Sequence, residues 1–257
     1  MAAMRLTLLG AFEARLDSGS AISFSRKKAE ALLAYLAVHP GQLQGRDKLA
    51  SLLWGDASDE RARHSLRQAL VTLRQALPCE AGPSLVEEAD TVGVNPAAVD
   101  VDVALFERLT SDGAPEALER AVGLYRGDLL EGISLQEPPF EEWLRTERER
   151  LRELAVDTCA KLLAYQARTG ATERAVQTAL RLLGLDPAQE AVHRTLMRLY
   201  ARLGRPGAAL RQYQLCAGIL DRELGVEPEP ETRQLYRDLL QSRPEAEPAQ
   251  RSRSTGP

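Results

Sequence analysis

The sequence has few of the residues that build metal, redox or membrane-spanning sites. It contains three cysteines and three histidines in 257 residues, and neither set has the short spacing of a zinc site or a disulfide framework. Its longest apolar run, residues 31–38, is far below the roughly 20 residues that cross a bilayer. Met1 to Gly10 lack the basic and apolar regions of a signal peptide. We therefore expect a cytoplasmic protein with no metal, no cofactor and no membrane contact.

The sequence motifs of common enzymes are absent as well. The glycines and lysine of residues 41–48 lack the GxxxxGK[ST] spacing of a phosphate-binding loop, and no serine lies in a GxSxG context. Aromatic residues make up only 5% of the chain, whereas alanine, leucine and arginine dominate and favour helices. The sequence predicts a largely helical protein that is not an enzyme.

Charge is unevenly distributed along the chain. The formal net charge is −4, but residues 24–77 hold nine basic and five acidic side chains, a local excess of +4. The remainder of the chain therefore carries a net charge of −8. A basic segment on an acidic chain indicates a negatively charged partner such as nucleic acid.

The first hundred residues combine short strands with amphipathic helices. Strands are predicted at residues 5–9, 12–16, 22–24, 84–87 and 91–94. Helices are predicted at residues 26–38, with Ser25 as the N-cap, 46–54 and 59–77. A small sheet, three helices and a hairpin with an acidic tip at residues 88–90 follow the order of an OmpR-type winged helix. The second and third helices would form the helix-turn-helix.

Beyond residue 101 the pattern is helical. Helices are predicted at residues 103–109, 115–125, 140–167, 172–183, 189–203, 206–224 and 231–240. Gly170 and Gly204 occupy matching turns 34 residues apart, each followed five residues later by Ala175 or Ala209. This spacing is the tetratricopeptide (TPR) period. The tail from residue 243 lacks large apolar side chains and is predicted to be disordered.

Taken together, these patterns predict a mainly α-helical protein with two domains. We expect an N-terminal OmpR-type winged helix (α+β) at residues 1–97. An all-α, TPR-like helical-repeat domain follows at residues 98–242, and a disordered tail at residues 243–257.

Many stretches, in this order, resemble those of a known family. Residues 24–36, LASLLWGD at 49–56 and residues 63–74 resemble the DNA-binding domain of SARP-type antibiotic regulators. The second half resembles the bacterial transcriptional activator domain, at residues 125–132, 143–151, 193–200, 204–213, 223–228 and 230–236. The resemblance covers about residues 4 to 241. It implies a transcriptional regulator, often an activator that recruits RNA polymerase at direct repeats.

The third predicted helix carries the expected base-reading surface. The candidates lie opposite its apolar stripe and are Arg61, His64, Arg67, Gln68 and Val71. Arginine pairs with guanine and glutamine with adenine in the major groove, where a thymine methyl would give Val71 an apolar partner. An ordinary solvated helix surface explains the charged residues equally well. The winged-helix order around this helix favours contact with double-stranded DNA.

A second set of cations is expected to bind DNA phosphates, which fixes register without reading sequence. Its members are Arg26, Lys27, Lys28, Lys48, Arg63 and Arg74. Cations at the start of a helix oppose its dipole, which favours a functional reason for residues 26–28. The acidic wing tip predicts only a weak contribution from the wing. RNA polymerase, and further copies of the chain bound in tandem on DNA, are the other expected partners.

Two alternatives remain at this point. The chain could be a TPR-type protein-interaction scaffold whose first domain is only structural, since helical repeats bind peptides along concave faces. It could also be the regulatory N-terminal part of a larger multidomain signalling protein, because the same two domains head proteins with ATPase or cyclase modules. The polar face of the third helix favours the regulator over the scaffold.

Overall fold

The structure is a computed structural model that describes residues 4–77 and 82–241. The chain divides into two compact units, one up to Leu162 and one from Leu163 onward. The predicted disordered tail lies outside the described residues. No helix in the described ranges is long and apolar enough to cross a membrane.

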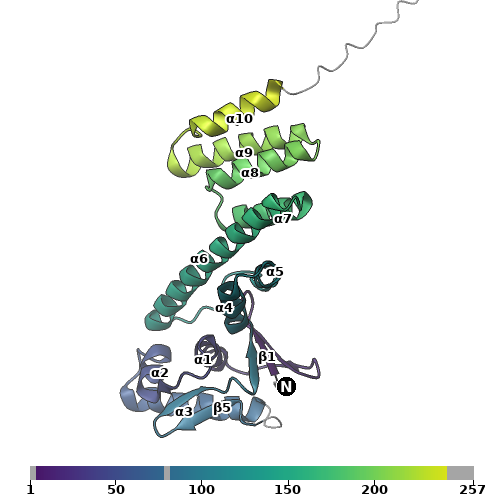
Figure 1. Cartoon of the computed structure of the whole chain (residues 1–257). Coiled ribbons are helices and arrows are strands. Elements are labelled where there is room, and N and C mark those ends of the chain that lie inside the picture. Colours follow the sequence, from purple (N-terminus) through teal and green to yellow (C-terminus); the bar gives the residue numbers. More distant parts are fainter. Residues whose placement is uncertain (1–3, 78–81, 242–257) are drawn as a thin grey trace, which may run out of the picture. The chain divides into compact units, whose positions relative to one another are not determined.

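The first unit begins with a small α+β region and ends with three helices (Figure 1). Its strands are β1 (Met4–Thr7), β2 (Glu13–Leu16), β3 (Ala21–Ile22), β4 (Gln44–Gly45), β5 (Leu85–Glu88), β6 (Thr91–Val94) and β7 (Val99–Val101). Its helices are α1 (Lys27–Val38), α2 (Arg46–Leu53), α3 (Asp59–Ala76), α4 (Asp102–Asp112), α5 (Pro115–Leu124) and α6 (Pro138–Arg168), the last of which continues into the second unit.

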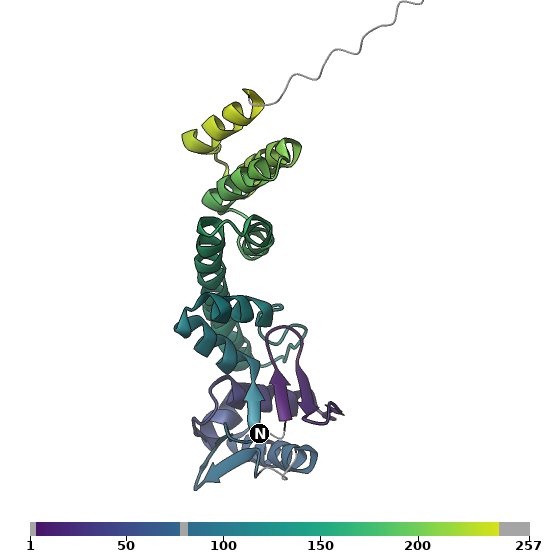
Figure 2. The same cartoon turned by 45° about the vertical axis from the view of Figure 1, so that its right-hand side comes forward.

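The strands form two sheets. One has the order β3-β2-β1-β7, and the other has the order β4-β6-β5. In the first sheet, β1 is antiparallel to β2 but parallel to β7, so that Met4 lies opposite both Leu16 and Val99. The β5–β6 hairpin lies beside α3, as a winged helix requires (Figures 1 and 2). The predicted winged-helix fold is confirmed.

Helix α1 forms the centre of this region. Its apolar stripe was expected on one face, yet Ala29 and every residue from Ala31 to Val38 are buried. A helix that is apolar all round is buried all round, and α6 supplies part of the cover. The Tyr35 ring of α1 meets the Trp143 ring of α6, with their centroids 4.7 Å apart.

A buried carboxylate joins the first strand to α4. Asp102, the first residue of α4, accepts hydrogen bonds at 2.9–3.0 Å from the backbone N–H groups of Leu8 and Leu9. Burial raises the pKa of this carboxyl above its ordinary value, and the backbone hydrogen bonds oppose that shift. Asp102 therefore fixes the end of β1 against the start of α4.

The second unit is made of paired helices. They are α7 (Thr172–Leu185), α8 (Glu190–Arg202), α9 (Pro206–Leu224) and α10 (Pro230–Gln241). Gly170 and Gly204 both have a left-handed backbone. The next N–H after each donates to the carbonyl five residues earlier, at 3.0 Å for Ala171 and 2.9 Å for Arg205. Both glycines thus close a helix in the same way, and the all-helical TPR-like half is confirmed.

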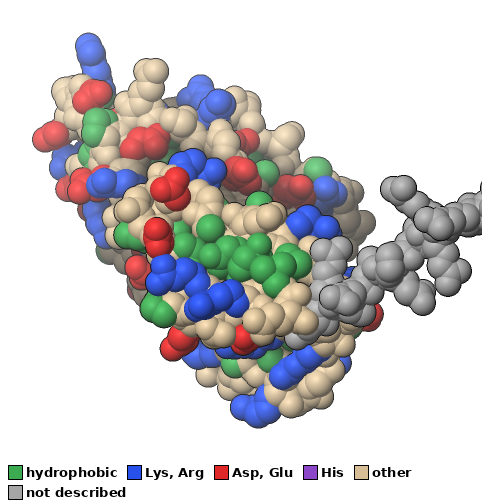
Figure 3. Space-filling view, turned by 90° about the horizontal axis from the view of Figure 1, so that it is seen from above, with side chains coloured by type: hydrophobic (Ala, Val, Ile, Leu, Met, Phe, Trp, Pro, Cys, Tyr) green, Lys and Arg blue, Asp and Glu red, His purple; other side chains and the backbone are tan. Residues whose placement is uncertain are grey.

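Several apolar side chains of the second unit are exposed. They are Leu180, Leu215, Leu224, Val226 and Leu240. Figure 3 looks onto the α10 side and shows hydrophobic side chains gathered in a patch beside basic ones. Exposed apolar groups that gather on one face are typical of a surface that meets another protein.

Some sequence-based details were wrong. Ser25 does not cap α1, because Arg26 is the N-cap and no side chain caps this helix. The third strand covers residues 21–22 instead of 22–24. Strands β4 and β7 were not predicted, since two or three residues are too few to show an alternating pattern. Because β7 pairs with β1, residues beyond 97 complete the N-terminal sheet.

Candidate nucleic-acid interface

Helix α3 has one buried face and one exposed face. Ala62, Leu66, Ala69, Leu70 and Leu73 are buried against the rest of the unit, which fixes the rotation of the helix about its own axis. The helix therefore presents the opposite face to solvent. Ser58 is its N-cap, and acidic side chains occupy its first turn.

All five candidate base-reading residues lie on the exposed face of α3. They are Arg61, His64, Arg67, Gln68 and Val71. Val71 is apolar and 40% exposed, so it offers an apolar contact on this otherwise polar face. A helix of this length with one exposed face fits the major groove, where its side chains reach base edges.

Arg63 lies on the side of α3 that faces α2. Its guanidinium donates two hydrogen bonds, at 2.7 and 3.1 Å, to the carboxylate of Asp47 on α2. The bond from Arg63 holds the pKa of the Asp47 carboxyl below its ordinary value. This pair links the two helices of the helix-turn-helix, and a phosphate would have to compete with Asp47 for Arg63.

Arg74 is engaged in a similar way at the other end of α3. The carboxylate of Glu87 on β5 accepts hydrogen bonds from Arg74 at 2.5–2.8 Å and from Arg46 at 2.5 Å. Glu87 thereby joins α3, the start of α2 and the wing. Between these elements lies a hollow of about 430 Å³, lined among others by Arg46, Arg67 and Asp90.

Lys28 contacts the turn of the helix-turn-helix. Its ammonium lies 2.5 Å from the Glu137 carboxylate and 5.3 Å from the centre of the Trp54 ring. The other Glu137 oxygen accepts a hydrogen bond at 3.1 Å from the N–H of Gly55. Glu137 is buried immediately before α6, so this carboxylate ties α1 and the α2–α3 turn to the start of α6.

The other three phosphate candidates make no ion pair with a carboxylate in the described ranges. Arg26 and Lys27 are exposed at the start of α1, and within the described ranges neither has an ion-pair partner. Lys48 of α2 is exposed as well; it donates to the Gln44 side chain at 2.9 Å and lies 5.8 Å from the centre of the Tyr35 ring.

The structure thus brings the five base-reading candidates onto one surface but divides the six phosphate candidates. Lys28, Arg63 and Arg74 hold carboxylates, whereas Arg26, Lys27 and Lys48 do not. Sequence reasoning missed Asp47, Glu87 and Glu137, the acidic partners that position this surface. Their pairs join residues 13 to 109 positions apart, and no local pattern marks them.

Substitution of Lys27 tests the phosphate assignment. Lys27→Ala should weaken binding to all DNA sequences alike and reduce the slope of log affinity against log salt by roughly one unit, because one released counterion is lost. Titrations of the full chain at several salt concentrations measure this slope. Lys161→Ala, an exposed lysine of α6 paired with Asp157, is the control. A changed sequence preference in Lys27→Ala would contradict the assignment.

The structure defines a winged-helix protein with a helical-repeat second half. The families that match this chain correspond to these two parts. Residues 97–240 match the family described as the bacterial transcriptional activator domain, and residues 19–94 match that described as "Transcriptional regulatory protein, C terminal". The chain belongs to the SARP-type bacterial transcriptional regulators. These matches are to transcriptional regulators, not to enzymes.

Individual relatives are distant but cover nearly the whole chain. The regulatory protein AfsR of Streptomyces coelicolor is 28% identical over 251 residues, which is 94% of this chain and 25% of AfsR. The transcriptional regulatory protein MoaR1 of Mycobacterium tuberculosis is 25% identical over 258 residues, 94% of this chain and 81% of MoaR1. This chain therefore spans about a quarter of AfsR but most of MoaR1.

A solved structure has the same architecture. EmbR of Mycobacterium tuberculosis, determined in complex with a low-affinity phosphopeptide, matches with a TM-score of 0.70 over 95% of this chain and 66% of EmbR. At 22% identity, this likeness shows the fold alone.

Proposed function

We propose that the chain is a sequence-specific, cytoplasmic transcription activator that reads direct repeats near promoters through α3. The observation that carries the proposal is the exposed face of α3, where Arg67 and Gln68 lie beside an apolar Val71 that is 40% exposed. A purely structural winged helix needs no such combination, whereas a major groove offers a partner for each of the three.

We also propose that the functional division lies at residue 97. The first part would read DNA, and the second would contact RNA polymerase or a neighbouring copy on DNA. The exposed apolar side chains of the second unit support a protein partner there. Because relatives include both a longer regulator and one of similar length, this assignment holds equally for an independent regulator and for the head of a larger protein.

Substitution of Arg67 tests the central claim. A preferred site is first selected from random duplexes with the full chain. Arg67→Ala should then weaken binding to that site by about 1–3 kcal/mol and relax the preference at one base position. Arg67→Lys keeps the charge but lacks the planar fork, so it should lose the preference and keep most of the nonspecific affinity.

Gln75→Ala, an exposed substitution near the end of the same helix, is the matched control. If Arg67→Ala keeps full affinity and the same preference, Arg67 does not read a base. If the wild-type chain selects no site at all, α3 is not a recognition helix and the activator proposal fails.

A further inference from the structure

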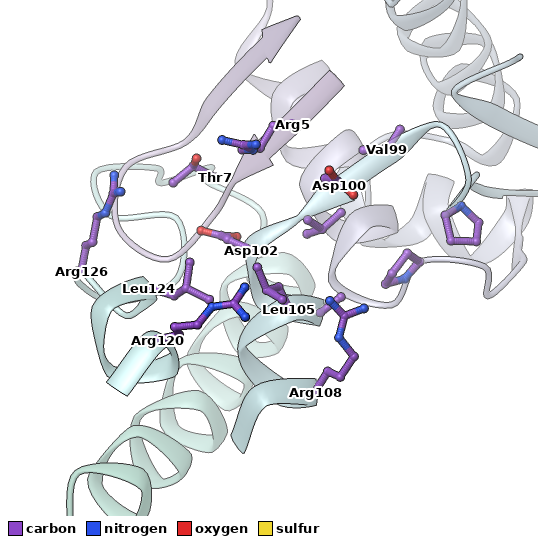
Figure 4. Close-up of a pocket in the computed structure, with 14 residues that line it drawn as sticks. Arg5, Thr7, Val99, Asp100, Asp102, Leu105, Arg108, Arg120, Leu124 and Arg126 are labelled. Carbon is purple, nitrogen blue, oxygen red and sulfur yellow. The ribbon is translucent and has the colours of Figure 1, made fainter. Parts of the chain in front are cut away.

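A second basic site lies away from α3, in the same compact unit. It is a cavity of about 530 Å³ between the first sheet and helices α4 and α5 (Figure 4). Four arginines line it, from β1 (Arg5), α4 (Arg108), α5 (Arg120) and the segment after α5 (Arg126). A volume of this size is typical of small-molecule sites in proteins.

These arginines cluster in a part of the chain that is acidic overall. Residues 98–162 contain 15 acidic and eight basic side chains, yet three of those eight line this one cavity. In the described chain none of the four arginines has a carboxylate within ion-pair distance. By contrast, Arg46, Arg63 and Arg74 all hold one. Arg126 acts on the Asp102 carboxyl only at longer range, where it opposes the rise in its pKa. Four guanidinium groups that make no ion pair around one cavity favour an anion as ligand.

The acidic side chains of the cavity do not neutralise it. Asp102 lines the cavity but directs its carboxylate to the backbone N–H groups of Leu8 and Leu9. Asp100 is exposed on β7, as are the four arginines on their own elements. Counted together, the two carboxylates and four guanidinium groups of the lining leave an excess of two positive charges.

Part of the wall is apolar. Leu105 of α4 and Leu124 at the end of α5 face the cavity near Asp102 in Figure 4. Two prolines, Pro40 and Pro96, also line it. A bare inorganic anion needs no such wall. A ligand with an apolar or planar body and several negative charges would use both parts of the lining.

We propose that this cavity binds a small organic polyanion of the nucleoside di- or triphosphate class, with its phosphates on Arg108, Arg120 and the neighbouring arginines and its base against the leucines. The inference goes beyond DNA binding by α3 and does not depend on it. The walls come from β1 and β7, which complete the winged-helix sheet, and from α4 and α5 of the regulatory half. A ligand bound there holds these elements together and is placed to act as an effector.

Calorimetric titration of the full chain with ADP, and separately with inorganic pyrophosphate, tests this site. ADP should bind, and Arg108→Ala and Arg120→Ala should each weaken it by roughly 10- to 100-fold, the usual loss for a hydrogen bond to a charged group. Pyrophosphate should bind more weakly than ADP, because it cannot use the apolar wall.

Arg145→Ala and Arg198→Ala, exposed arginines on α6 and α8, are the controls and should leave ADP binding unchanged. Thermal unfolding of each variant verifies that the substitution has not altered the fold, and Arg108→Lys and Arg120→Lys replace any alanine variant that fails. Absence of ADP binding, equal losses in the controls, or pyrophosphate binding as tightly as ADP would overturn the proposal.

Affinity for the selected DNA site, measured without nucleotide, separates this site from α3. Arg120→Ala should leave that affinity and its salt dependence unchanged. A lower salt slope would mean that these arginines hold DNA phosphates instead, and would also overturn the proposal. Loss of DNA reading in Arg67→Ala leaves ADP binding intact, so the two proposals fail independently.

Discussion

On DNA with two direct repeats, the full chain should bind about 10²- to 10⁴-fold more tightly than on DNA with one repeat, whereas a chain that ends at Arg168 should show no such gain. One winged helix buries only about 600–1,000 Å² on DNA, which gives a weak single site. Contacts between neighbouring copies convert the second binding event into a local one and raise the apparent affinity without new base contacts.

Gel-shift titrations with both chains on one-repeat and two-repeat DNA measure this gain. The shortened chain keeps the whole first unit and all of α6, so its affinity for one repeat should match that of the full chain. Separating the repeats by about five more base pairs, half a helical turn, is the control and should abolish the gain. Equal cooperativity in both chains would leave polymerase contact as the remaining role of helices α7–α10.

The largest expected loss of stability comes from Asp102→Ala. This change removes the acceptor of two buried backbone N–H groups, those of Leu8 and Leu9. A buried donor left without a partner costs about 1–3 kcal/mol, so we expect the free energy of unfolding of the first unit to fall by about 2–5 kcal/mol. Asp102→Asn keeps one acceptor oxygen and should lose less.

Tryptophan fluorescence in urea isolates this effect, because both tryptophans, Trp54 and Trp143, belong to the first unit. The midpoint should shift while the slope with urea stays unchanged. Asp100→Ala, two residues earlier and exposed on the same strand, is the matched control and should have little effect. An Asp102→Ala midpoint equal to that of the wild type would show that the carboxylate is not needed to fix β1 to α4.

What the sequence predicted well depends on local periodicity. The buried and exposed faces of α3 follow from apolar residues spaced three and four positions apart, so the base-reading candidates could be placed on one surface before the structure was known. The 34-residue spacing of Gly170 and Gly204 located the helix pairs for the same reason. In each case the information lies within one helix or one turn.

What it did not predict depends on contacts between distant residues. The pair of Lys28 and Glu137 joins residues 109 positions apart. Without its partner in view, Lys28 was predicted to bind a DNA phosphate. The arginine cavity is assembled from residues between Arg5 and Arg126, none of which forms a motif with its neighbours. The excess of basic residues lies in residues 24–77, so charge along the sequence does not reveal the arginine cavity.

The pairing of β1 with β7 has a consequence for how the protein is made. The strand that begins the chain cannot complete its sheet until Val99 to Val101 have left the ribosome, and the turn of the helix-turn-helix gains its hydrogen bond only when Glu137 has followed. At about 5–20 residues per second, this leaves the DNA-reading region unfinished for on the order of ten seconds during synthesis. Until then the edge of β1 is open, and a nascent chain released early should be recognised by chaperones or proteases, not by DNA.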